Sequence, residues 1–237
     1  MNRPSPHRAA AAPAGSLVCD LHTHTHYSRD CLTSLEAFLE ACRRKGLDRV
    51  AVTDHNTIAG ALRLKEMDPE RIIVGEEIRT THGELIAYFL TDPVPPGLPP
   101  EETIERVHAQ GGVVGISHPL DRLRREAMRE ATLSLLDRVD FLEAFNARCL
   151  LPSDNRAAHA LAERHGLPMS AGSDAHSAGE LGMAVVVLPP FDSPAAFLES
   201  LRQGRIRGRI SPPWFHLTSL YAKIARRAGW SPLPEAP

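Results

Sequence analysis

Four short hydrophobic stretches of this chain end in histidine or aspartate side chains. They read LVCDLHTHTH (17–26), RVAVTDH (49–55), GVVGISH (112–118) and PMSAGSDAH (168–176). Continuous apolar runs of this length are typical of parallel strands buried on both faces, and the carboxyl ends of such strands meet at one rim of a barrel. The pattern therefore predicts an α/β barrel whose open end collects side chains able to bind metal ions.

The rest of the chain alternates between strand and helix patterns. Leu35, Phe38, Leu39 and Cys42 recur at helical spacing, and Gly46 follows where a helix C-terminus favours glycine. Further strands are expected at 71–78, 83–90, 139–147 and 182–188, and further helices at 57–66, 101–110, from about 123, at 154–165 and at 194–202. The proline-rich stretch 92–100 predicts a loop. The alternation favours parallel connections and a barrel-like sheet.

The length of 237 residues suits one large α/β domain or two small ones, and barrels often reach this size as a single domain. We expect residues 1–16 to be a disordered tail, because prolines interrupt any signal-peptide hydrophobic region. Residues 17–210 then form the domain, and residues 211–237 a C-terminal extension.

Charge and cysteine content limit the partners that we expect. Lys and Arg number 27 and Asp and Glu 29, a net charge of −2, so no global basic field favours long nucleic acids. The cysteines show neither CxxC spacing nor disulfide-scaffold density, which favours a cytoplasmic protein. No apolar run approaches the roughly 18 residues of a membrane span, so we expect no membrane partner.

Pairs of candidate ligands two residues apart stand at the first and last of the four strand ends. His22 and His24 are two residues apart, so in a strand both imidazoles face the same side and can reach one ion. Asp174 and His176 repeat this spacing. Asp30, on the loop after the first strand, offers a carboxylate oxygen.

The middle strand ends add further candidate ligands. His55 closes the second strand, and either Glu76 or Glu77 lies at the third. Pro119 favours an extended backbone at the preceding residue, which should keep His118 at the strand mouth. Mixed imidazole and carboxylate ligands suit Zn²⁺, Mn²⁺ and Fe²⁺ and leave positions open for water.

Five motifs follow one another in the chain: DLHTHTHYSRD, AVTDHN, GEEI, GGVVGISHP and AGSDAHS. In this order they resemble the PHP family, the polymerase and histidinol phosphatase domains, over residues 17–190. The resemblance implies a distorted (β/α)7 barrel that holds two or three divalent metal ions at the carboxyl ends of its strands. It implies the ligand set His22, His24, Asp30, His55, Glu77, His118, Asp174 and His176.

One position departs from the family pattern. Many PHP proteins have a histidine in the strand after the GxE motif, whereas this chain reads HGELIAYFL there. Glu84 is the candidate substitute for that ligand at the third metal position.

Candidate substrate contacts lie near the sixth strand and the first loop. The run FLEAFNARCL resembles the Glu-x-x-Asn segment of stand-alone PHP proteins, and it contains Asn146 and Arg148. Arg148 follows the strand end, where its guanidinium is either a two-point phosphate ligand or part of a solvated surface. His26 lies beyond its strand end and is interpreted as a solvent or substrate contact.

Other basic and aromatic residues have weaker signals. Arg205, Arg207 and Arg209 alternate, and they form either a second phosphate-binding candidate or a solvated basic surface. We interpret the remaining histidines as surface or packing residues: His82, His108, His159, His165 and His216. The segment GRIRGRISPPW resembles the C-terminal extension of stand-alone PHP proteins, and Trp214 and Trp230 are expected to anchor the tail.

These features predict a metal-dependent phosphoesterase that hydrolyses a phosphomonoester of a small metabolite or nucleotide. A metal-activated hydroxide would attack phosphorus. We expect Asp174 to orient or deprotonate the water, and His118 or His176 to assist the leaving group.

Three other functions fit parts of the same pattern. A nuclease or phosphodiesterase acting on short nucleic-acid ends would use the same ions. An amidohydrolase would share the His-x-His start but would need a bridging lysine, and none stands at a strand end here. A non-catalytic metal-binding accessory module is disfavoured, because every expected motif but one is intact.

Overall fold

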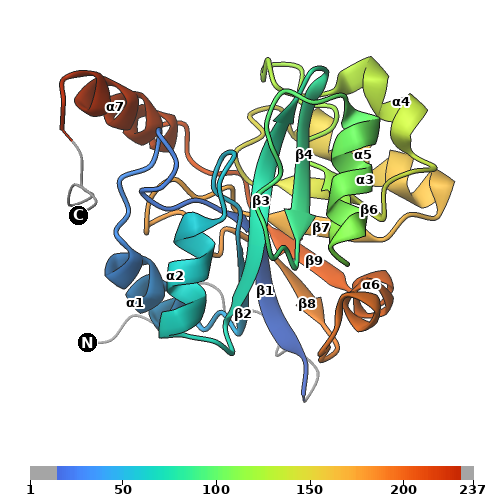
Figure 1. The fold of residues 1–237 in the computed structure, drawn as a ribbon, viewed down its shortest axis with the longest axis horizontal. Coiled ribbons are helices and arrows are strands. Elements are labelled where there is room, and N and C mark those ends of the chain that lie inside the picture. The colour runs from blue at the N-terminus through green and yellow to red at the C-terminus, as the bar shows by residue number, and fades with distance from the viewer. Residues whose placement is uncertain (1–14, 231–237) are drawn as a thin grey trace.

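The computed structural model describes residues 15–230, so residues 1–14 of the expected tail lie outside it. Nine strands of the described chain form one sheet in the order β7-β6-β5-β4-β3-β2-β1-β8-β9 (Figure 1). Their bounds are β1 Leu17–Thr23, β2 Arg49–Val52, β3 Ile72–Thr80, β4 Gly83–Tyr88, β5 Val113–Ile116, β6 Phe141–Asn146, β7 Met169–Gly172, β8 Ala184–Leu188 and β9 Arg205–Gly208.

The sheet curves until its first and seventh strands meet. Thr23 and Ala175 form a parallel bridge, the His24 N–H donates to the Ala175 carbonyl at 3.0 Å, and the Asp174 N–H donates to the His22 carbonyl at 2.8 Å. β8 and β9 continue the sheet beyond β1. The predicted α/β, barrel-like fold class is confirmed.

The expectation of parallel connections throughout is wrong for four strand pairs. β4 runs antiparallel to both β3 and β5, β8 is antiparallel to β1, and β9 to β8. Only Thr81 and His82 separate β3 from β4, and a parallel crossover needs a dozen residues or more. Because β4 is reversed, its first residues lie at the rim where the parallel strands end.

Most predicted helices are present in the described chain. They are α1 Leu35–Lys45, α2 Ala59–Met67, α3 Pro100–Ala109, α5 Pro152–His165, α6 Pro194–Arg202 and α7 Phe215–Arg227. Ser34 caps α1 by accepting from the Ala37 N–H, and Gly46 ends it with φ +68°, a backbone conformation that glycine adopts without steric cost.

The helix expected from about Leu123 is absent from the described chain. Only a 3₁₀ turn, Arg129–Ala131, and the short α4, Thr132–Leu135, form in this region. The Leu123 N–H donates to the Asp121 carboxylate and the Arg122 N–H to the Asp154 carboxylate. These side chains satisfy the backbone donors, so the segment is a loop.

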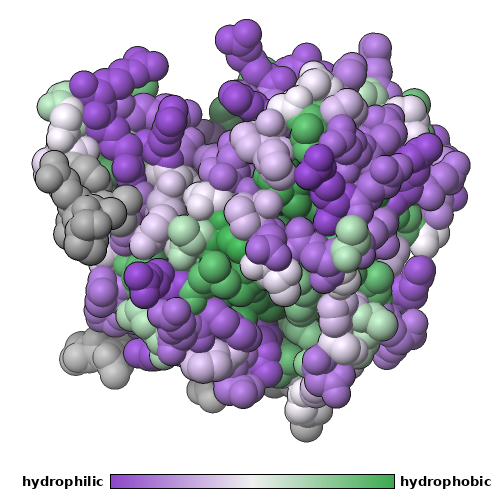
Figure 2. Space-filling model, viewed as in Figure 1, coloured by the Kyte–Doolittle hydropathy of each residue, from purple (hydrophilic) through white to green (hydrophobic). Residues whose placement is uncertain are grey.

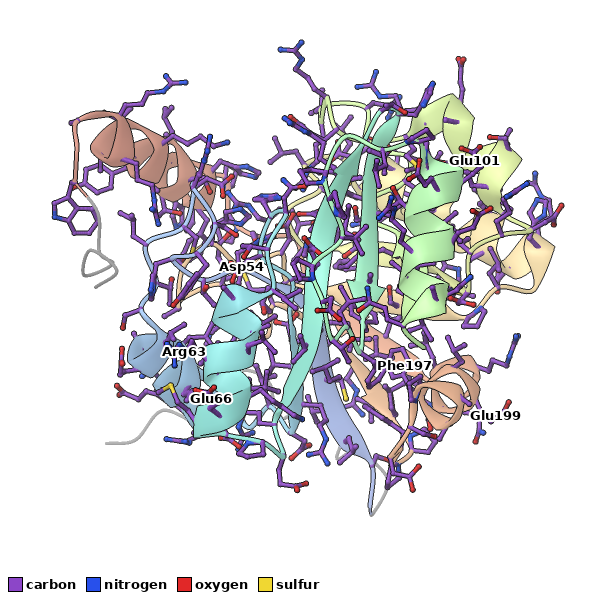
Figure 3. The ribbon with its side chains drawn as sticks, viewed as in Figure 1. Asp54, Arg63, Glu66, Glu101, Phe197 and Glu199 are labelled. Atoms are coloured by element: carbon purple, nitrogen blue, oxygen red, sulfur yellow. The ribbon has the colours of Figure 1, made fainter. Side chains whose placement is uncertain are left out.

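The hydrophobic core has an inner part and an outer part. The inner part fills the barrel, where Tyr88 stacks on Phe141 with ring centroids 5.1 Å apart and its hydroxyl donates to the Leu21 carbonyl. Phe197 of α6 packs edge-on against Tyr88, and Figure 3 shows it pointing toward the strands while Glu199 points away. The outer part lies between the sheet and helices such as α1 and α2.

Helix α7 packs differently from the other helices. Within it only Ser219 and Ala222 are buried, and Phe215 is half-buried against the barrel. Four other large apolar side chains are exposed: Leu217, Leu220, Tyr221 and Ile224. Trp214 is 64% exposed and Trp230 52% exposed, so the expectation that they anchor the tail is wrong. No helix of the described residues is long and apolar enough to cross a membrane.

The closure of the barrel leaves no space for a side chain at Gly172. A Cβ there would lie 2.2 Å from the His22 Cβ and 2.6 Å from the His22 backbone nitrogen. We expect Gly172→Ala to destabilise the protein by about 1–3 kcal/mol through overpacking and to weaken metal binding by displacing His22. Thermal unfolding and metal analysis check this.

Gly46→Ala is the matched control. Nothing lies within 4 Å of the Cβ that this substitution adds. The left-handed backbone at residue 46 should therefore lower the free energy of unfolding by only about 1 kcal/mol, and metal binding should be unchanged. Equal metal content in the Gly172→Ala and Gly46→Ala proteins would contradict the packing argument.

Candidate metal centre

Histidine side chains from the ends of β1, β2 and β5 converge around Glu77 of β3. Its Oε1 lies 2.9 Å from His118 Nε2 and 3.3 Å from His22 Nε2. Its Oε2 lies 3.1 Å from His55 Nδ1 and 3.5 Å from His24 Nε2. The structure therefore brings the predicted residues of β1, β2, β3 and β5 together at one point.

The remaining predicted ligands adjoin this group. Asp174 Oδ1 lies 3.2 Å from His24 Nε2, and Asp30 Oδ1 lies 3.3 Å from His176 Nε2. Three sets of ligand atoms each lie within 4.8 Å of one another: His24, His55 and His176; His22, His24 and Asp174; His55, Glu77 and Glu84.

Glu84 occupies the position at which the sequence departs from the family pattern. Its Oε2 lies 3.5 Å from His118 Nε2 and its Oε1 lies 3.7 Å from His55 Nδ1. Glu84 stands near the start of β4, paired with Arg79 of β3. The reversed direction of β4 is what brings this carboxylate to the metal-binding rim, and an all-parallel barrel would have placed it at the other end.

The donor atoms of this cluster fit divalent metal ions. Within the described chain, several are buried and have no hydrogen-bond partner: His22 Nε2, His24 Nε2, Asp30 Oδ1, Glu77 Oε2 and Asp174 Oδ1. Buried polar atoms normally have a partner. Zn²⁺, Mn²⁺ and Fe²⁺ prefer sets of imidazole nitrogens and carboxylate oxygens such as these.

Glu143 of β6 orients two of the histidines. Its Oε1 lies 2.9 Å from His22 Nδ1, and its Oε2 accepts from the His118 backbone N–H at 2.6 Å. Such outer contacts fix the ring orientation of a metal ligand. Asn146, predicted as a substrate residue, donates to Glu143 Oε2 and Asp174 Oδ2, so it holds two carboxylates in place.

Sequence reasoning missed Arg124. Its Nη2 donates to Asp174 Oδ2 at 2.6 Å from the loop after β5. This segment was expected to be a charged helix from about Leu123, and such a pattern does not indicate that one arginine turns inward. The contacts of Asp121 and Asp154 shape this loop, and they can be recognised only in the folded structure.

Two site residues have left-handed backbones. His118 has φ +31° and Asp174 has φ +52°. The extended conformation expected at His118 before Pro119 is wrong, because the His118 N–H turns inward to Glu143 and its carbonyl accepts from the Asp121 N–H at 3.2 Å. Strained backbones of this kind often occur at functional sites.

Burial and mutual charge shift the pKa values of the cluster. Burial, with the positive charges of His176 and His55, lowers the pKa of His24 to about 3. Burial alone would also lower the pKa of His22, but the carboxylates of Glu77, Glu143 and Asp174 raise it well above its usual value. Burial alone would raise the pKa of Asp174, but Arg124 and the histidines hold it well below its usual range.

A cavity of about 890 Å³ opens beside the cluster, lined by His55, His176, Arg124 and Arg148 among others. Figure 2 shows the surface hollowed between α7 and the β3–β4 side of the barrel. Arg148 is only 4% exposed and donates to the Ser219 hydroxyl at 2.9 Å, so it is no solvated surface residue.

His26 and the arginines of β9 lie elsewhere. The His26 ring contacts the Thr33 carbonyl, and His26 does not belong to the described lining of the cavity. Arg205, Arg207 and Arg209 are likewise not part of that lining.

Fold and site together define a barrel-like α/β protein with a cluster of histidine and carboxylate side chains able to hold metal ions. The family model described as the PHP domain matches residues 20–142, and the one described as PHP-associated matches residues 152–206. The chain belongs to the PHP family, as its motifs indicated.

The chain is also similar to individual proteins. Uncharacterized protein MJ1587 of Methanocaldococcus jannaschii is 38% identical over 144 residues, which cover 55% of this chain and 82% of that protein. A two-domain protein of Bacteroides vulgatus, described as containing a predicted PHP-like metal-dependent phosphoesterase, superposes with a TM-score of 0.68 at 18% identity, covering 94% of this chain and 74% of the other.

The lesion-specific endonuclease EndoQ of Pyrococcus furiosus is also similar. It superposes with a TM-score of 0.61 at 19% identity, covering 81% of this chain and 57% of that one. At this identity the two structures share the fold alone, which is that of PHP-like metal-dependent phosphoesterases.

Glu77 and its neighbour Glu76 form a matched pair for testing the metal centre. Glu76 is buried but turns to the opposite side, where it accepts from the Val94 N–H at 2.9 Å. We expect Glu77→Gln to weaken metal affinity beyond the roughly 10–100-fold that loss of an outer contact costs. Glu76→Gln should retain wild-type metal content by mass spectrometry. Equal metal content in both variants would remove Glu77 from the ligand set.

Proposed function

We propose that the protein hydrolyses a phosphomonoester of a small metabolite or nucleotide in a metal-dependent reaction. The observation that carries this proposal is the set of unpartnered, buried ligand atoms around Glu77 next to a cavity that the guanidinium groups of Arg124 and Arg148 line. Metal ligands and guanidinium groups together suit a phosphoryl group, whose oxygens accept both kinds of contact.

The residues that would hold the ions are those of the predicted ligand set, with Glu84 as an added carboxylate. Divalent ions bound there would act as Lewis acids and supply a nucleophilic water at neutral pH. We infer that their number is two or three.

Asp174 is suited to orienting the attacking water. Arg124 and Asn146 engage its Oδ2, whereas its Oδ1 has no hydrogen-bond partner within the described chain. The fixed Oδ2 holds the carboxylate plane, so Oδ1 keeps a constant direction. Its depressed pKa keeps the group ionised.

His176 is better placed than His118 to assist the leaving group. Both were candidates for this role, but of the two only His176 lines the cavity. The His176 ring is fixed through Nδ1, which lies 2.8 Å from the Asp174 carbonyl.

A nuclease acting on short nucleic-acid ends is the second candidate function. Arg29, Arg79 and Arg125 also line the cavity, and together they offer cationic contacts beyond one phosphoryl group. Activity on oligonucleotide ends that exceeds activity on monoesters would favour this function.

Chelation and a substrate panel test the proposal. Chelator should abolish hydrolysis of phosphomonoesters, and Mn²⁺ or Zn²⁺ should restore it, because the ions provide the nucleophile and the charge compensation. The panel contains monoesters, diesters and short oligonucleotides. Full activity after chelation, with no metal detected by mass spectrometry, would contradict metal dependence. A metal-loaded protein inert on the whole panel would favour the accessory-module alternative.

Asp174→Asn separates a catalytic from a structural role of this carboxylate. Asparagine tolerates a positive φ, so the backbone should be retained. Removing one preorganised electrostatic contact should lower kcat by about 100-fold or more. Asp92→Asn, in an exposed loop, is the control for the same chemical change. Loss of rate only in proportion to loss of folded protein would refute the catalytic role.

A further inference from the structure

Helix α7 forms one wall of the cavity next to the metal centre. His216, Ser219, Leu220 and Lys223 of this helix line it. The matched PHP ranges are 20–142 and 152–206, so α7 and Arg148 both lie outside them. This side of the cavity is therefore built by parts of the chain that the family models do not cover.

Polar contacts fix α7 to the loop that carries Asp30. Arg226 donates to the carbonyls of His26, Ser28 and Cys31, and Lys223 Nζ lies 3.3 Å from Asp30 Oδ2. The helix is thus held in a definite place over the cavity, although most of its apolar side chains are exposed.

Arg148 uses only part of its guanidinium in these contacts. Its Nη2 donates to the Ser219 hydroxyl and the Phe215 carbonyl, and its Nε lies 3.5 Å from Glu180 Oε1. Its Nη1 is buried and has no hydrogen-bond partner among the described residues. A buried guanidinium N–H without an acceptor is costly, so an anionic acceptor from the cavity would satisfy it.

His216 also has a side-chain nitrogen that lacks a hydrogen-bond partner. Its Nε2 is buried and unpartnered within the described chain, and the residue lines the same cavity as Arg148. Burial and the charges of Arg148 and Arg124 lower the pKa of His216. With a hydrogen on Nε2, the ring can donate to an anion from the cavity. The sequence-based interpretation of His216 as a surface or packing residue does not account for this atom.

We propose that Arg148 Nη1 and His216 Nε2 form a subsite for a phosphoryl oxygen that the metal centre leaves free. The subsite rests on the proposed phosphoesterase function and makes its substrate class more specific. A phosphomonoester has three non-bridging oxygens and a diester has two. Additional donors for a third oxygen therefore favour the monoester dianion over the diester.

Variants of His216 test the subsite, because Arg148 also holds α7 and its loss could displace the helix. His216→Ala should weaken binding of inorganic phosphate to the metal-loaded protein about 10-fold, the size expected for loss of a hydrogen bond to a charged group. It should lower kcat/KM for a monoester by a similar factor and change kcat/KM for a diester little. Calorimetry gives the phosphate Kd.

Two further variants separate recognition from structure. In His216→Gln the side-chain amide can donate in place of Nε2, so it should recover part of the phosphate affinity. Leu217→Ala removes a neighbouring side chain that is 62% exposed on the outer side of α7, and it should match the wild type. Thermal unfolding and metal stoichiometry are measured on all proteins.

The outcomes distinguish the subsite from the function on which it rests. Unchanged phosphate affinity in His216→Ala, or an equal loss on monoester and diester, would overturn the subsite. If the metal-loaded wild type hydrolyses neither ester, the proposed function fails, and phosphate binding alone then decides on the subsite.

Discussion

The carboxylate of Glu77 is the feature on which the rest of the site depends. It is fully buried, and its oxygens lie within 3.5 Å of imidazole nitrogens from His22, His24, His55 and His118. An ionised carboxylate in the interior costs several kcal/mol unless charge or hydrogen bonds compensate it. His55 follows β2, the direct neighbour of β3, whereas the histidines of β1 and β5 reach Glu77 because the sheet curves. Closure of the sheet then brings Asp174, after β7, to His24. The bridge between Thr23 and Ala175, and the missing side chain at Gly172, are therefore conditions for the metal centre as well as for the fold.

The cost of burying charged groups also explains the residues that lie behind the ligands. Glu143 binds the far nitrogen of His22, and Arg124 binds the far oxygen of Asp174, so each ligand faces the ion-binding space with its other atom. Without ions, these buried charges have only each other as partners. A group that binds the folded state alone stabilises it, so metal binding is expected to contribute to folding as well as to chemistry.

The sequence was sufficient where a residue's position follows from strand periodicity. The ends of β1, β2, β5 and β7 were predicted from apolar runs, and the ligands that follow these strands meet as expected. It was insufficient where position depends on side-chain contacts between distant segments. The loop that turns Arg124 inward is set by Asp121 and Asp154, and the rim position of Glu84 by the reversed β4. The buried Nε2 of His216 depends on the docking of α7, which no local pattern encodes.

The candidate metal ligands and the proposed phosphate subsite lie on different parts of the fold, and this affects which substrates the protein can select. The candidate ligands sit on strand ends of the barrel, where the backbone geometry is rigid. The proposed phosphate subsite instead joins Arg148 to a helix that is held on the barrel by polar contacts and by the packing of Phe215. A helix held in this way can shift or change its cavity-facing residues without disturbing Glu77 and its histidines. Selection among phosphate esters is therefore expected to follow residues such as His216 and Lys223, while the metal centre keeps the same chemistry.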